Sequence, residues 1–138
     1  RRVSDAPPAA LGEPARVDPG LLWLGGRLSK HRFGDQIVHQ AQLWFRAEGQ
    51  KRPELTIRIE VFDADGKRLR KWDRRALAGV YPMSRWRAGE VVELKQFMRF
   101  DFKAGRIAVK MSLVKGRDVV AGPFDLGTVV HEQVAPPG

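Results

Sequence analysis

One alternating run decides the fold of this chain: Leu55-Thr56-Ile57-Arg58-Ile59-Glu60-Val61. Apolar and polar residues alternate strictly in it, and successive side chains of a β-strand point to opposite faces. The run therefore predicts a strand with one face in a hydrophobic core and the other in water. The following residues, Asp63-Ala64-Asp65-Gly66, predict a hairpin turn, because Asp and Gly accept the backbone angles that turns require.

Comparable segments lie on both sides of this run. We expect further strands at residues 21–30, 37–46, 67–72, 90–102 and 107–113, with residues 119–121 and 124–130 supplying the last pairing segments. The first should bend or bulge at Gly25-Gly26. About seven strands at this spacing, without a helical apolar stripe, are typical of an all-β, antiparallel, two-sheet β-sandwich of the immunoglobulin-like kind. The expected core residues are Leu43, Phe45, Ile57, Ile59, Val61, Phe100, Val109 and Met111.

The 138 residues suit one domain, which we place at 21–133. Residues 1–20 and 134–138 are rich in Pro and Ala and are predicted to be linkers. Because the sequence starts at Arg1, we expect a module of a longer polypeptide. The longest apolar runs, such as Leu21-Leu22-Trp23-Leu24, are far too short for a transmembrane segment.

The composition limits the kinds of metal and catalytic site that this chain can form. The chain has no Cys, which excludes disulfides, thiolate metal sites and cysteine nucleophiles. His31, His39 and His131 are too far apart to suggest a metal pair, and His39 falls on the inward face of its strand. Asp63 to Gly66 would begin a calcium loop only if more oxygen ligands followed, whereas cations follow. We therefore expect no metal, no cofactor and no enzymatic activity.

Other catalytic patterns are weak. There is no Gly-x-Ser-x-Gly elbow and no glycine-rich phosphate loop. Five glutamates would need to be paired by the fold to act as a glycosidase couple, and solvated carboxylates are the simpler expectation. They are Glu48, Glu54, Glu60, Glu90 and Glu93.

The formal net charge of +9 is the main compositional anomaly. It permits binding to a polyanion, and it also fits an ordinary solvated surface. The densest cluster, with two tryptophans nearby, is the candidate site for an anionic polymer or glycan. Its residues are Lys67, Arg68, Arg70, Lys71, Trp72, Arg74, Arg75, Arg85, Trp86 and Arg87.

The tryptophans allow a second interpretation, because exposed indole rings on a sandwich can stack against sugars. Trp44 and Trp72 are expected on the faces opposite the apolar sets of their strands. Packing in the core or at an edge is the expectation for each of Trp23, Trp44, Trp72 and Trp86.

The order of several motifs resembles an accessory β-sandwich domain of bacterial membrane glycosyltransferases of the mannosyltransferase type. The motifs are Leu43-Trp44-Phe45-Arg46-Ala47, Val61-Phe62-Asp63-Ala64-Asp65-Gly66, Asp73, the stretch 79–92 from Gly79-Val80-Tyr81-Pro82 to Gly89-Glu90-Val91-Val92, and the 100–113 strand pair. In that family the domain lies at the extracytoplasmic C-terminal end, and catalysis belongs to the membrane part. The resemblance implies a periplasmic or extracellular location, while composition alone leaves the cytoplasm open.

We therefore expect a non-catalytic accessory module of a bacterial envelope or surface protein, which docks a neighbouring domain or subunit. The alternative is a binding module for acidic polysaccharide or nucleic acid, using the basic cluster. A third possibility is an inhibitor-like sandwich that inserts the loop 79–89 into a protease.

Overall fold

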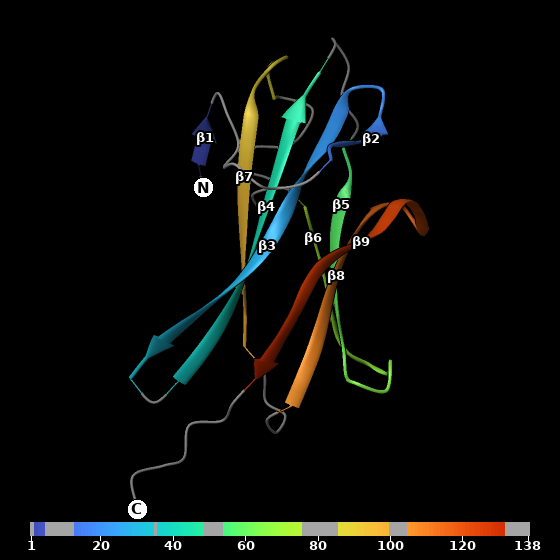
Figure 1. Ribbon diagram of the computed structural model, residues 1–138. Coiled ribbons are helices and arrows are strands. Elements are labelled where there is room, and N and C mark those ends of the chain that lie inside the picture. Colours follow the sequence, from blue (N-terminus) through green and yellow to red (C-terminus); the bar gives the residue numbers. More distant parts are fainter. Residues whose placement is uncertain are drawn as a thin grey trace, which may run out of the picture.

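The computed structural model describes residues 2–4, 13–34, 36–48, 54–75, 86–99 and 105–131; for residues 2–4, 74, 75 and 131 it describes the backbone alone. All regular structure in these residues is β-strand, arranged in two antiparallel sheets (Figure 1). The predicted all-β sandwich is confirmed.

The first sheet has five strands in the order β1-β7-β4-β3-β2. Their bounds are β1 Arg2–Ser4, β7 Val91–Met98, β4 Gln36–Ala47, β3 Leu21–Phe33 and β2 Ala15–Asp18. Two of them, β1 and β2, fall within residues 1–20, so strand pairing begins inside the range predicted as linker. This is why there are more strands than the seven or so expected. Residues 134–138, the second predicted linker, lie outside the described residues.

The second sheet has four strands in the order β6-β5-β8-β9. Their bounds are β6 Arg68–Arg75, β5 Thr56–Phe62, β8 Gly105–Lys115 and β9 Asp118–His131. The chain crosses between the sheets from β4 to β5, from β6 to β7 and from β7 to β8. These crossings are the Greek-key connections of immunoglobulin-like sandwiches.

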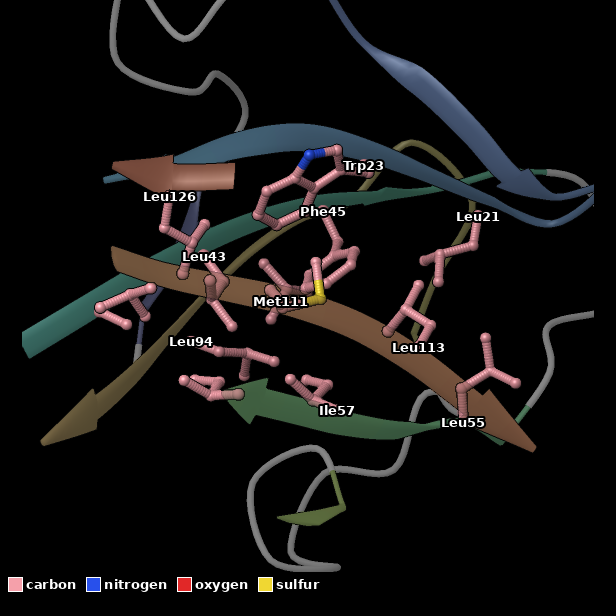
Figure 2. Close-up of a cluster of buried hydrophobic side chains, with 14 of the residues drawn as sticks. Leu21, Trp23, Leu43, Phe45, Leu55, Ile57, Leu94, Met111, Leu113 and Leu126 are labelled. Carbon is pink, nitrogen blue, oxygen red and sulfur yellow. The ribbon is translucent and has the colours of Figure 1, made fainter. Parts of the chain in front are cut away.

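The main core lies between the two sheets, with side chains from both pointing into the gap (Figure 2). On β5, Ile57, Ile59 and Val61 are at most 2% exposed, as the alternating run predicts. Leu43, Phe45, Val109 and Met111 are also buried, whereas Phe100 lies outside the described residues. Burying each such side chain contributes roughly 1.5 to 3 kcal/mol.

The predicted irregularity in β3 is present. The register with β4 shifts between Trp23 and Gly25, and Gly25 has a φ of 132°, which favours glycine. Trp23 lies in the main core, while Leu24 joins a second apolar cluster with Trp44 and Val91. Leu24 is the extra residue, so the side-chain phase of β3 changes after it, and Gly26 and Leu28 pair with the core-side residues Leu43 and Ala41.

The turn predicted at Asp63 to Gly66 is confirmed by its hydrogen bonds. The Asp63 N–H donates to the Lys67 carbonyl at 2.9 Å. The Asp63 Oδ1 accepts the N–H groups of Asp65 and Lys67, each at 2.9 Å. This carboxylate oxygen therefore stabilises the turn by accepting two of its backbone hydrogen bonds.

Candidate binding surfaces

The predicted basic cluster lies mainly on β6, at the edge of the four-stranded sheet. Pairing with β5 splits its side chains between two faces. Trp72 is opposite Ile59 and Arg70 is opposite Val61, so both lie on the core side. Trp72 is half-buried against the main core, and the prediction that it points away from the core is wrong. The side-chain alternation of β6 has the opposite phase to the one expected.

On the outer face of β5 and β6, positively and negatively charged side chains alternate. Arg58 of β5 donates two hydrogen bonds to Asp73, from Nε to Oδ1 at 2.8 Å and from Nη2 to Oδ2 at 3.1 Å. Arg68 contacts Glu60 at 3.1 Å, and Lys71 Nζ lies 3.8 Å from Asp73 Oδ2. Part of the positive charge of this cluster is therefore balanced by carboxylates within the same sheet.

These contacts also shift two pKa values. The hydrogen bonds from Arg58 lower the pKa of Asp73, because they stabilise its ionised form. The same hydrogen bonds raise the pKa of Arg58. The pair holds β5 and β6 together as charged partners.

The rest of the predicted cluster is dispersed. Trp86 is 1% exposed, and its ring centroid lies 6.0 Å from that of Phe45. It is a core residue, so its ring does not present a stacking surface to a ligand. Arg87 is exposed in the turn before β7, and its N–H donates to Glu90 Oε2 at 3.1 Å. Arg85 lies outside the described residues, as do the side chains of Arg74 and Arg75.

All four tryptophans are at least half-buried, so the expectation of packing is confirmed for each. Trp44 does face away from the main core, as predicted, but it is only 3% exposed. The guanidinium of Arg27 lies 5.3 Å from its ring centroid. Among the residues whose side chains the structure describes, the exposed aromatic rings are those of phenylalanines and a histidine, not tryptophans.

These exposed rings lie on the outer face of β3, β4 and β7, which we call the aromatic face. It consists of Ser29, His31, Phe33, Gln40 and Phe97. Phe33 is 58% exposed and Phe97 is 52% exposed. The His31 ring lies between them, with centroids 6.3 Å from Phe33 and 6.4 Å from Phe97.

Sequence reasoning missed the aromatic face. The bulge at Gly25 changes the phase of β3, so the outward positions of His31 and Phe33 could not be read by simple counting. Phe97 was detectable, because it alternates with the core residues Leu94 and Met98 on β7.

Three more exposed apolar side chains lie on β9, the other edge of the four-stranded sheet, two at its start and one near its end. Val119, Val120 and Val130 are 50%, 46% and 47% exposed. The two segments predicted at 119–121 and 124–130 form one strand here, and the β8–β9 register shifts at three points along it.

Several predicted polar residues have clear structural partners. His39 is fully buried on the inward face of β4, as expected. Glu48 contacts Arg16 at 2.6 Å, Glu60 contacts Arg68, and Glu93 lies 3.5 Å from Lys95.

Within the described residues, no group of three or more His, Cys, Asp or Glu side chains is placed to hold a metal ion. The same part of the chain contains no helix of the length and apolarity needed to cross a membrane. Neither a scan against protein-family models nor a search of curated proteins found a match to the chain.

Proposed function

We propose that this chain is a non-catalytic accessory module of a larger bacterial envelope or surface protein, and that it docks a neighbouring domain or subunit through β9. The observation that carries the proposal is the apolar character of this sheet edge. Three of the five large hydrophobic side chains exposed in the described residues belong to β9, and two of them, Val119 and Val120, are adjacent at its start.

The contrast between the two edges of one sheet supports this role. An edge strand has backbone groups directed away from the sheet, and charged side chains discourage pairing with another chain. The β6 edge carries such charges, with Arg68 and Lys71 on its outer face. The beginning of β9 instead exposes Val119 and Val120. A partner strand added beside Asp118 to Ala121 would cover these valines and pair with the backbone.

The resemblance to an accessory domain of membrane glycosyltransferases supports the same role and a periplasmic or extracellular location. The partner would then be another domain of the same polypeptide or a subunit of its assembly.

Hydrogen exchange tests the docking surface. Backbone amides of residues 118–121 should exchange more slowly in the native polypeptide or complex than in this chain alone. Amides of β6 provide an internal control and should not change. The double substitution Val119→Lys with Val120→Lys should remove the added protection, whereas Ala88→Lys, at an exposed turn position, should not. Identical exchange of residues 118–121 in both contexts would contradict docking at β9.

The basic cluster is the alternative binding site for an anionic polymer, and its exposed position at the edge of the sheet supports this alternative. The ion pairs to Glu60 and Asp73 weaken that case. Binding there would be strongly salt-dependent. Replacing Arg70, Arg74 and Arg75 together by Glu should abolish binding to polyuridylate or polygalacturonate near 50 mM salt, if this cluster is the site.

A further inference from the structure

We infer that the aromatic face is a binding site for an acidic polysaccharide. It lies on the five-stranded sheet, on strands that include neither the basic cluster nor the β9 edge. The inference goes beyond the docking role, and it depends on a different set of residues.

The first argument is the exposure of the rings. Phe33 and Phe97 leave more than half of their surface in water, although the main core takes apolar residues from the same three strands. His31 joins them into a continuous set of three rings. The C–H face of a pyranose ring is apolar and flat, so it can cover such rings and remove their surface from water.

The second argument is the set of hydrogen-bonded polar side chains beside the rings. Gln40 stands between Ser29 and Phe97 in the paired strands. Its Oε1 accepts a hydrogen bond from His31 Nε2 at 3.0 Å and from Ser29 Oγ at 3.3 Å. Gln40 is itself only 5% exposed. These bonds fix the imidazole and the hydroxyl at the surface, where they can meet the hydroxyl groups of a sugar.

The third argument is the positive charge in the neighbouring row. Arg27, Gln42 and Lys95 lie side by side across β3, β4 and β7, two positions from the row of Ser29, Gln40 and Phe97. Two positions along a strand correspond to roughly 7 Å. A sugar stacked on Phe97 would therefore bring a carboxylate of the same or the next sugar close to the cations.

Both cations are held in place. Arg27 Nε donates to Gln42 Oε1 at 3.0 Å, and its guanidinium lies over the Trp44 ring. Lys95 Nζ lies 3.5 Å from Glu93 Oε1, and the Glu93 side chain is 8% exposed. Because this acid is buried, the exposed part of the row is positive and complements a ligand with spaced carboxylates.

The balance of groups favours a polysaccharide over a nucleic acid. A single nucleic-acid strand carries a phosphate at every nucleotide, and proteins that bind it line the backbone path with cations. Here the cations occupy one row, while the next row offers a hydroxyl, an amide and a phenyl ring. Alternating apolar faces, hydroxyls and occasional carboxylates are the pattern of a uronic-acid polymer.

The test uses oligogalacturonate as the acidic probe, its methyl ester as the neutral match, and polyuridylate as the nucleic-acid probe. We expect saturable binding of oligogalacturonate that weakens with salt, with NMR shifts concentrated at His31, Gln40 and Gln42. The ester should bind more weakly, because it lacks the carboxylates that face Arg27 and Lys95.

Variants locate the site. Replacing Phe33 and Phe97 together by Ala should weaken oligogalacturonate binding roughly tenfold, as expected for the loss of two stacking rings. Val130→Ala, at an apolar position on the other sheet that is 47% exposed, should leave the affinity unchanged. The triple Glu variant of Arg70, Arg74 and Arg75 should still bind. Absence of binding, a preference for polyuridylate, or loss of binding only in the triple variant would each overturn the inference, and none of them would affect docking at β9.

Discussion

At the scale of single residues, Trp86 illustrates how burial separates a structural side chain from a binding one. Its ring packs on Phe45 inside the main core and is 1% exposed. Removing a large buried ring costs both the transfer free energy and a cavity. We predict that Trp86→Ala lowers the free energy of unfolding by about 3 to 5 kcal/mol, measured by chemical denaturation.

Phe97→Ala is the matched control, because it removes an aromatic ring that is 52% exposed. It should change the free energy of unfolding by no more than about 0.5 kcal/mol. Equal losses in the two variants would mean that Phe97 also supports the fold, which would remove it from the aromatic face.

Asp73 gives a residue-scale prediction in pH. Hydrogen bonds from Arg58 hold its pKa below the ordinary value in the folded chain. Its contribution to stability is therefore fully present above the pKa of the unfolded chain, and it is lost as the pH falls through the folded pKa. The pair is partly exposed, so this contribution is at most about 1 kcal/mol.

We expect an NMR titration of the Asp73 carboxyl carbon to show this lowered pKa. Arg58→Gln should raise the pKa of Asp73 towards its ordinary value, because the charged donor is gone. Arg117→Gln, an exposed arginine in the β8–β9 turn, should leave that pKa unchanged. A pKa that does not respond to Arg58→Gln would contradict the assigned cause.

At the scale of elements, Gly26 marks a close approach between β3 and its surroundings. A Cβ there would lie 2.9 Å from the backbone oxygen of Gln42 and 2.7 Å from Leu126 Cδ2 of β9. The backbone oxygen cannot move without disturbing the β3–β4 pairing. We predict that Gly26→Ala destabilises the protein by about 1 to 3 kcal/mol in thermal or chemical unfolding.

Gly105→Ala, at the start of β8, is the control for this substitution. A Cβ there meets nothing within 4 Å, and the backbone of Gly105 does not require a positive φ. It should cause no loss of stability. A Gly26→Ala variant as stable as Gly105→Ala would show that β3 and β9 do not approach this closely.

The same elements show what sequence can reveal about this fold. Strict alternation identified β5 and its core side chains, and the Asp and Gly residues identified the turn at Asp63, because each depends on local chemistry. Alternation did not predict the face of the sheet on which a side chain lies where a bulge or register shift changes the order of inward and outward positions. The bulge in β3 and the register shift between Val61 and Phe62 decide which face His31 and Trp72 occupy, and both are fixed by the partner strand.

The candidate surfaces were harder to predict for a related reason. A run of cations such as Lys67 to Arg75 is visible in the sequence, but Glu60 and Arg58 of β5 meet it only through strand pairing. The aromatic face gathers residues from three strands that are distant along the chain. Neither a charge balance nor a surface built from several strands can be obtained from the composition of one segment.

At the scale of the whole molecule, one core cluster contains side chains from both sheets. Distant segments pair to build it, with β4 against β7 and β5 against β8. Such long-range pairing predicts folding in milliseconds to seconds rather than microseconds. It also means that neither sheet can bury its apolar face without the other.

We therefore predict a single cooperative unfolding transition. The four tryptophans sample both clusters, since Trp23 and Trp86 lie in the main core and Trp44 in the outer cluster with Leu24 and Val91. Tryptophan fluorescence and far-ultraviolet circular dichroism should give coincident midpoints in urea, as expected for a two-state domain. Trp44→Phe removes the fluorescent reporter of the outer cluster, and the fluorescence and dichroism midpoints of this variant should still coincide with each other. An earlier transition reported by Trp44 alone would show that the outer cluster opens independently of the sandwich.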